Sequence, residues 1–162
     1  MRIGSILENQ SIEKRIAITP EVVKKYISLG FEICLIKNYG IHLGINDEDY
    51  LKVGAKISED EKEILKSSDI IVQLGMLSDE KSSLIKENQI IVGVLNPYIN
   101  KEKLENLAKK KINLFSLELL PRITRAQSMD ILSPQANLAG YKAVIESFAN
   151  FEKAIPMMMT AA

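Results

Sequence analysis

Short hydrophobic runs alternate along this chain with segments in which charged and apolar residues are mixed. Five of these runs are rich in Ile, Val and Leu and are almost continuously apolar: 2–7, 31–36, 69–74, 89–95 and 112–119. Continuous hydrophobicity over so few residues is typical of β-strands that are covered on both faces, as in a parallel sheet. The pattern therefore predicts five buried strands.

The segments between these runs carry the signals of helix beginnings and ends. In the first of them, Thr19 is expected to cap a helix, Pro20 suits its first turn and Gly30 its end. Four more segments start with acidic residues, which are favoured near the N-terminus of a helix: 47–54, 58–68, 78–88 and 100–111. The repeated strand–helix order predicts an α/β fold, a parallel sheet with flanking helices of the flavodoxin-like or Rossmann-like class.

The end of the chain follows a different pattern. Apolar residues recur at helical spacing from Pro134 to Lys153, which predicts one long helix with Ser133 as its N-cap. The segment that follows, AIPMMMTAA, is strongly apolar, as is typical of a buried connector. We therefore expect an α/β domain at 1–133, a connecting helix at 134–153, and at 154–162 the start of a connector to a second domain that this chain does not contain.

Composition narrows the classes of partner. The chain of 162 residues has 21 basic and 21 acidic side chains, so it offers no strongly basic surface for nucleic acid. Its N-terminus lacks the apolar core of a signal peptide, and no run approaches the roughly 20 apolar residues of a membrane span. The single cysteine, Cys34, lies in FEICLI and is expected to be a buried, inert thiol. Together these features predict a cytoplasmic protein.

The sequence contains no complete site of a familiar kind. Its eight glycines form neither G-x-G-x-x-G nor a P-loop, so the chain lacks the backbone cradle that holds a pyrophosphate. The only histidine, His42, lies in a predicted loop without Cys or carboxylate partners at ligand spacing. We therefore expect neither a metal site nor a catalytic triad.

The candidate chemistry is concentrated in one segment, LLPRITRAQSMDILSPQANLAGY at 119–141. Two of the chain's four arginines, Arg122 and Arg125, lie there. Pro121 and the β-rich ITR are expected to keep the backbone extended at the carboxyl edge of the sheet, where open α/β folds bind ligands. Arg122 can present a planar fork to a carboxamide, carboxylate or phosphate oxygen, which a lysine cannot match.

Three polar side chains of this segment are spaced three residues apart. Gln127, Asp130 and Ser133 would be gathered on one face by a single helical turn. The alternative interpretation is a local one, in which Arg122 and Asp130 form a salt bridge and Ser133 only caps the helix. The residues alone leave a binding role and a structural role open.

Three stretches resemble a known family. PRITRAQSMDILSPQANLAGYKAVIESF resembles the signature of the alpha subunit of proton-translocating NAD(P) transhydrogenase, and IPMMMTAA resembles the connector before its dinucleotide-binding domain. The opening EKRIAITPEVVKKYISLGFEI is similar to the start that this subunit shares with alanine dehydrogenase. The resemblance covers essentially the whole chain.

The resemblance implies roles for individual residues. Arg122, Asp130 and Ser133 would hold the nicotinamide carboxamide of NAD(H), and Gln127 would align NAD(H) with NADP(H) bound by a partner domain; these four form the expected catalytic set. The positions implied at the cofactor are Arg122, Ile123, Thr124, Gln127, Asp130, Leu132 and Ser133. Pro134 departs from the family, in which we expect a serine in many members, and removes one hydroxyl contact. The activity implied is hydride transfer between NAD(H) and NADP(H), coupled to proton translocation.

The same resemblance implies partners. They are the NADP(H)-binding and membrane components of the transhydrogenase, together with a homodimeric arrangement and a peripheral location at the inner membrane. Most contacts to NAD(H) would come from the family's second, Rossmann domain. The chain alone is therefore expected to be inactive and to bind NADH weakly, because it lacks a glycine-rich loop.

Two other interpretations remain. Alanine dehydrogenase needs a lysine and a histidine for its keto acid, whereas this chain has Gln73 and Asn96 at the corresponding strand ends, and neither titrates. Arg15 matches that family's substrate arginine, but without those partners we interpret it as structural. A non-enzymatic flavodoxin-like interaction module would need a carboxylate cluster at its strand ends, which Glu8 and Asp69 are not expected to form.

Overall fold

The computed structural model describes residues 1–153, so the expected connector at 154–162 lies outside the described residues. The chain divides into two compact units, Met1–Leu120 and Pro121–Ala162, which we describe separately.

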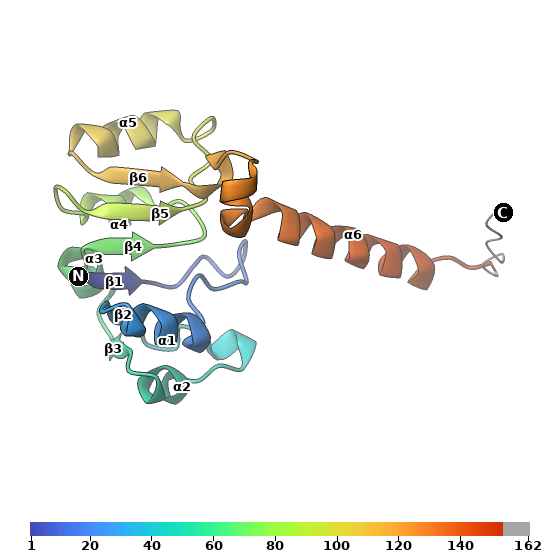
Figure 1. The fold of residues 1–162 in the computed structure, drawn as a ribbon, viewed down its shortest axis with the longest axis horizontal. Coiled ribbons are helices and arrows are strands. Elements are labelled where there is room, and N and C mark those ends of the chain that lie inside the picture. Colours follow the sequence, from blue (N-terminus) through green and yellow to red (C-terminus); the bar gives the residue numbers. More distant parts are fainter. Residues whose placement is uncertain (154–162) are drawn as a thin grey trace. The chain divides into compact units, whose positions relative to one another are not determined.

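The first unit is built on a six-stranded parallel sheet with the strand order β3-β2-β1-β4-β5-β6 (Figure 1). This order confirms the predicted Rossmann-like α/β class. The strands are β1 Arg2–Ser5, β2 Glu32–Ile36, β3 Lys56–Ser58, β4 Ile70–Val72, β5 Ile90–Gly93 and β6 Asn113–Ser116. Five of the six lie within the predicted hydrophobic runs.

The sixth strand, β3, was not predicted. It has only three residues, Lys56, Ile57 and Ser58, and pairs at the edge of the sheet with Cys34, Leu35 and Ile36. One apolar residue between two polar ones is too short a pattern for a periodicity to be recognised. An edge strand of this kind depends on its neighbour rather than on its own hydrophobicity.

Helices connect the strands close to where the sequence predicts them. Thr19 caps the first helix by accepting a hydrogen bond from the Val22 amide, and Pro20 is its first residue. Gly30 follows it in the left-handed region, with φ of 87°. The helical segments of this unit are α1 Pro20–Ser28, η1 Ile41–Leu43, α2 Asp47–Lys52, α3 Glu61–Ser67, α4 Asp79–Ser83, α5 Lys101–Lys109 and η2 Leu117–Leu119.

The helices lie on two faces of the sheet. Gly4 faces α3, because a Cβ added there would lie 2.8 Å from Ile64 of that helix. From β1 the chain adds β2 and β3 toward one edge of the sheet, and then β4, β5 and β6 toward the other edge. Right-handed crossovers therefore place α1 on one face of the sheet and α3, α4 and α5 on the other. In Figure 1, α1 lies on the viewer's side of the sheet, and α3 and α4 are drawn fainter behind it.

Cys34 lies inside the sheet, as expected. Its side chain belongs to the hydrophobic core and is buried. Burial raises the pKa of the Cys34 thiol, because the thiolate would lose its hydration. The thiol is therefore protonated at neutral pH and inert, as the sequence predicts.

The second unit contains η3 Thr124–Met129 and the long helix α6 Leu132–Ala149. The expectation of an extended backbone is correct at Ile123 but wrong from Thr124, where the 3₁₀ helix begins. The helix predicted at 134–153 also begins two residues earlier and ends four residues earlier. It ends early because the Asn150 side-chain amide donates to the Glu146 carbonyl oxygen at 2.8 Å and so satisfies the last turn.

The start of α6 differs from the prediction, because Ile131 occupies the N-cap position and the side chain that satisfies the first amides is that of Asp130, one residue earlier. Asp130 Oδ1 accepts hydrogen bonds from the backbone amides of Leu132 at 2.8 Å and Ser133 at 3.1 Å. Ser133 was expected in this role but lies inside the first turn. A carboxylate is the better acceptor at this end of a helix, where the backbone dipole is positive. Among residues 1–153, no helix combines the length and hydrophobicity needed to cross a membrane.

Candidate functional site

The strand order places a cavity at the carboxyl edge of the first unit. Connections leave the sheet in opposite directions after β1 and β4, and open α/β sheets bind ligands at such a switch point. A cavity of about 360 Å³ lies there, lined by the loops after β1 and β4 and by the beginning of α5. Its polar lining includes Glu8, Gln73, Lys81, Asn100 and Lys103.

Gln73 forms the floor of this cavity and is only 3% exposed. Its Oε1 accepts hydrogen bonds from the Ile6 amide at 2.9 Å and from the Ser5 hydroxyl at 3.0 Å. Its Nε2 donates to Glu8 Oε1 at 3.2 Å. The side chain thus ties the end of β4 to the end of β1, and its neutral amide is engaged in structural hydrogen bonds.

Glu8 lies beside Gln73 at the same edge of the sheet. Its carboxylate accepts a hydrogen bond from the backbone amide of Leu74 at 2.5 Å. Burial raises the pKa of Glu8, and the hydrogen bond from Leu74 opposes that effect only in part. Asp69 lies before β4, at the opposite edge, where it accepts from the Arg2 amide at 2.7 Å. The two carboxylates therefore form no cluster, which counts against the interaction-module alternative.

Glu8→Gln is expected to change how stability depends on pH. The raised pKa means that the folded protein binds a proton at Glu8 more tightly than the unfolded chain does. This contribution is fully present below the ordinary value of 4.5 and is lost as pH rises through the raised pKa. The free energy of unfolding of the wild type, minus that of the variant, should therefore fall with rising pH in urea titrations.

Glu13→Gln provides a control of opposite sign. The hydrogen bond from Arg15 lowers the pKa of Glu13, so its contribution is present above the ordinary value and is lost as pH falls. A wild-type-minus-Glu8→Gln difference that stays constant or grows with pH would contradict a raised pKa of Glu8.

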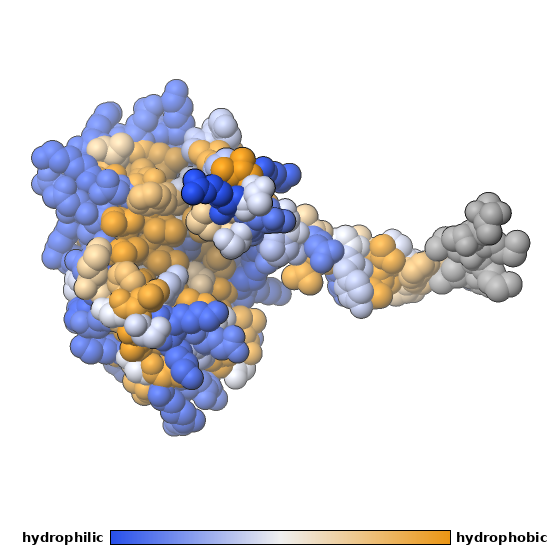
Figure 2. Space-filling view, in the orientation of Figure 1, coloured by the Kyte–Doolittle hydropathy of each residue, from blue (hydrophilic) through white to orange (hydrophobic). Residues whose placement is uncertain are grey.

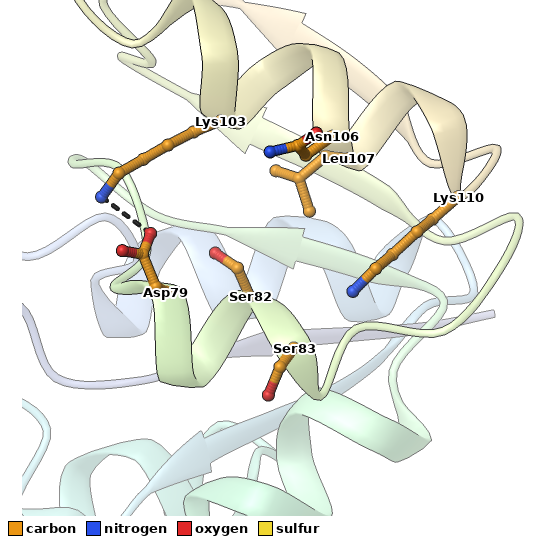
Figure 3. Close-up of a pocket in the computed structure, with 7 residues that line it drawn as sticks. All are labelled: Asp79, Ser82, Ser83, Lys103, Asn106, Leu107 and Lys110. Carbon is orange, nitrogen blue, oxygen red and sulfur yellow. Dashed lines mark ion pairs between the residues drawn. The ribbon is translucent and has the colours of Figure 1, made fainter.

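The lysines near the cavity already have carboxylate partners. Lys81 pairs with Glu61 at 2.9 Å, and Lys103 pairs with Asp79 at 2.9 Å. The second pair spans a neighbouring groove of about 200 Å³ between α4 and α5, where Figure 3 shows Lys103 reaching across to Asp79. Neither lysine is therefore an isolated cation positioned to capture an anionic ligand.

Two positions compared with alanine dehydrogenase also have local roles. Asn96 follows β5 in a left-handed conformation with φ of 47°, which asparagine tolerates well, and its backbone amide donates to Glu118 Oε1 at 2.5 Å. Arg15 makes a two-pronged ion pair with Glu13, with Nε 2.8 Å from Oε1 and a terminal nitrogen 2.6 Å from Oε2. This pair supports the structural interpretation of Arg15.

His42 lies on η1 and supports the loop that follows β1. Its Nε2 donates to the Lys14 carbonyl oxygen at 2.8 Å. Its Nδ1 then accepts a hydrogen bond from the side-chain amide Nε2 of Gln10 at 3.1 Å. Within residues 1–153 no three His, Cys, Asp or Glu side chains gather in a group that could hold a metal ion.

In the second unit, Asp130 and Ser133 lie together as their spacing predicts. Besides the two capping bonds from the backbone, Asp130 Oδ2 accepts a hydrogen bond from the Ser133 hydroxyl. The Ser133 hydroxyl is the largest cause of a lowered Asp130 pKa, followed by the two backbone donors. A carboxylate accepts about four hydrogen bonds, so about one position on Asp130 remains open to a further donor.

The other predicted site residues of this unit present exposed side chains. The alternative of an Arg122–Asp130 salt bridge is not found among the described residues, although the charge of Arg122 contributes to lowering the Asp130 pKa. Gln127 lies on η3 and contributes only its backbone carbonyl to the Asp130 amide, at 3.3 Å. Ile123, Thr124 and Leu132 are also exposed, with Ile123 at 55% and Leu132 at 39%.

Comparisons with known proteins agree with this architecture. Residues 5–139 match the family model described as alanine dehydrogenase/PNT, N-terminal domain. A curated relative from Rickettsia prowazekii, named as the first portion of NAD(P) transhydrogenase subunit alpha, is 45% identical over 166 residues. That match covers 100% of this chain and 43% of the relative.

Two solved structures are similar in fold. The crystal structure of transhydrogenase from Sinorhizobium meliloti matches 99% of this chain and 48% of that chain, with a TM-score of 0.88 and 38% identity. An L-alanine dehydrogenase structure matches 90% of this chain and 40% of that chain, with a TM-score of 0.81 but 23% identity. The chain spans less than half the length of each of these proteins.

Proposed function

Because the chain belongs to the alanine dehydrogenase/PNT N-terminal-domain family, we propose that it is the beginning of the NAD(H)-binding component of a proton-translocating NAD(P) transhydrogenase. The observation that carries this proposal is the 45% identity to a transhydrogenase alpha subunit, which extends over all of this chain. The similarity to the transhydrogenase structure, at a TM-score of 0.88 and 38% identity, also supports it.

The exposed side chains of the second unit suit the nicotinamide end of NAD(H). Arg122 can donate to the carboxamide oxygen, and the remaining acceptor position of Asp130 can take the carboxamide N–H. The Ser133 hydroxyl, which donates to Asp130, keeps that carboxylate oriented and ionised. NAD(H) itself supplies the hydride chemistry, and this chain would hold the ring in place.

Gln127 would act at the meeting point of the two nucleotides. Direct hydride transfer requires the two rings to approach within about 3.5 Å in a defined orientation. Gln127 is neutral and exposed on η3, so it can position a ring without taking part in proton transfer. The pyrophosphate has no glycine-rich cradle in this sequence and would be bound by the family's second domain.

The proposal includes partners. The Rickettsia relative is named as one portion of subunit alpha, which indicates that its enzyme has further components. We infer that an NADP(H)-binding component and a membrane component assemble with this chain in a homodimeric complex at the inner membrane. The division of the chain into an α/β domain at 1–133, a connecting helix at 134–153 and the start of a connector at 154–162 belongs to the same proposal.

Alanine dehydrogenase is the second candidate, and the site geometry argues against it. Gln73 is buried and uses its amide to join the ends of β1 and β4, and Asn96 lies in a tight turn. Neither residue can donate or accept a proton in turnover. The 23% identity to the L-alanine dehydrogenase structure supports a shared fold only.

A chimaera tests the proposed function. Residues 1–162 would replace the matching region of the Rickettsia prowazekii relative, in the presence of that transhydrogenase's other components. NADH should then reduce an NADP⁺ analogue, whereas the 162-residue chain alone should be inactive and should bind NADH weakly. Oxidation of alanine with NAD⁺, or a well-folded chimaera that transfers no hydride, would contradict the proposal.

A further inference from the structure

The charged side chains of the first unit are distributed unevenly between the two edges of its sheet. The crossover helices run back against the strands, so their C-terminal ends meet at the amino edge. In α1, α2, α3 and α5 the first turn carries acidic residues and the last turn a lysine. The equal totals of 21 basic and 21 acidic side chains therefore conceal a concentration of lysine at the amino edge.

A group of exposed lysines lies where the chain enters β4, β5 and β6. We call it the lysine edge, and its members are Lys66, Lys86, Lys109, Lys110 and Lys111. The first two line a hollow of about 420 Å³, and the other three line a hollow of about 490 Å³. Glu87 lines both hollows, so the two adjoin. Figure 2 shows hydrophilic residues at the left of the view, where Figure 1 places the end of α5 and the loops that lead into β5 and β6.

Most of the lysine edge has no carboxylate partner. Lys111 pairs with Glu87, but among residues 1–153 no Asp or Glu forms an ion pair with any of the other four lysines. The helix dipole accounts for lysines in or beside the last turn of α3 and α5. It does not account for Lys86, which lies three positions after the end of α4. The lysine edge is therefore a positive surface available to an anionic partner.

The composition of the lysine edge fits a lipid surface better than a protein or a nucleic acid. Protein interfaces are depleted in lysine and enriched in arginine and aromatic residues, and unpaired bases stack on aromatic rings. Among the described residues that line the two hollows, none is an arginine or an aromatic residue. Lysines on flexible stems instead follow lipid phosphates without a fixed geometry. The Met1 side chain, 66% exposed, lines the first hollow and can enter the boundary below the headgroups.

We propose that the lysine edge contacts anionic phospholipid headgroups of the membrane at which the complex assembles, an inference that rests on the proposed function. The membrane component would hold the complex at the bilayer, and the lysine edge would add an electrostatic contact to the lipid itself. Each lysine near an anionic surface strengthens binding about fivefold. Four unpaired lysines therefore favour an anionic over a neutral bilayer by roughly 100-fold to 1,000-fold at low salt.

Vesicle co-sedimentation of the 162-residue chain tests this proposal. Vesicles of phosphatidylcholine with phosphatidylglycerol are compared with vesicles of phosphatidylcholine alone, which report binding through apolar surfaces such as α6. We expect a preference for the anionic vesicles that declines as salt is raised, because salt screens exposed charges. The triple variant Lys86→Gln, Lys109→Gln and Lys110→Gln should lose about 100-fold of this preference.

A second triple variant removes the same charge from the opposite edge of the sheet. Lys14→Gln, Lys62→Gln and Lys101→Gln change exposed lysines in the loop after β1 and at the beginnings of α3 and α5. The nine residues of α5 separate its two ends by about 12 Å, which exceeds the screening length of about 10 Å at 0.1 M salt. This control should therefore bind anionic vesicles like the wild type. Circular dichroism and thermal unfolding establish that both variants are folded.

Several outcomes would overturn the proposal. These are equal binding to anionic and neutral vesicles, equal losses in the two triple variants, or binding of polyglutamate or duplex DNA as tight as that of anionic vesicles, which would show attraction to any polyanion. Hydride transfer by the chimaera in detergent solution is read separately. Transfer by a chimaera whose 1–162 region shows no preference for anionic vesicles would refute the lipid contact and leave the proposed function intact.

Discussion

Arg122→Ala in the chimaera is expected to weaken NADH binding about 10-fold to 150-fold. The variant loses hydrogen bonds from a charged donor, each worth about 1.5–3 kcal/mol, and each 1.4 kcal/mol is a factor of about ten in affinity. Asp130→Asn should weaken NADH binding in the same direction. Because its neutral amide is a poorer acceptor for the Leu132 and Ser133 amides, that variant should also loosen the beginning of α6.

Gln127→Asn distinguishes positioning from binding in the same experiment. The shorter side chain keeps the amide group, so NADH affinity should change little, whereas single-turnover hydride transfer should slow because the rings are misaligned. A purely structural role for 121–133 predicts lower thermal stability with unchanged transfer per folded molecule. If all three variants show that second pattern, the assignment of these residues to the cofactor is wrong.

Gly4→Ala should strongly destabilise the sheet. The added Cβ would lie 2.2 Å from the Ser68 hydroxyl oxygen and 2.8 Å from Ile64 Cγ2, both of which are buried. The Ser68 hydroxyl already donates to the Ile64 carbonyl oxygen at 2.7 Å, so it cannot move aside without losing that bond. Overpacking costs about 1–3 kcal/mol and the hydrogen bond about 1 kcal/mol, so the free energy of unfolding should fall by about 2–4 kcal/mol.

Gly75→Ala adds the same methyl group in the same unit, at a position where the added Cβ makes no close contact. Its Cβ would meet only the end of the Glu8 side chain, at 3.4 Å, which is an ordinary contact. The free energy of unfolding of this variant, from urea titration, should stay within about 0.5 kcal/mol of the wild type, or rise slightly through the lower entropy of the unfolded chain. Equal losses in the two variants would mean that the close approach of α3 to β1 is not the cause.

The fold was largely predictable because its determinants are local. Continuous apolar runs of four to eight residues identify buried strands, and a Thr19–Pro20 start followed by Gly30 specifies α1 almost residue by residue. The strand β3 escaped prediction because one apolar residue, Ile57, carries no periodicity. Its position is fixed by pairing with β2, about 20 residues earlier in the chain.

The candidate site was predictable only to a limited extent, for a related reason. The spacing of Asp130 and Ser133 correctly indicates that they meet, but it does not reveal which of them caps α6. The choice depends on the backbone turning at Asp130, where η3 ends. The contacts of Gln73 with Ser5, Ile6 and Glu8 join residues more than 60 positions apart, so no local sequence pattern predicts them.

The central position of β1 has a consequence for synthesis on the ribosome. Its Ile3 pairs with Ile33 of β2 on one side and with Ile70 of β4 on the other. At about 5–20 residues per second, the first strand of the nascent chain waits roughly 3–14 seconds for its second neighbour. During that interval β1 is an edge strand with an unpaired row of backbone groups, the kind of surface that joins strands of other chains. The nascent chain therefore exposes β1 as an edge until β4 has emerged, and this exposure is set by the strand order rather than by the stability of the finished sheet.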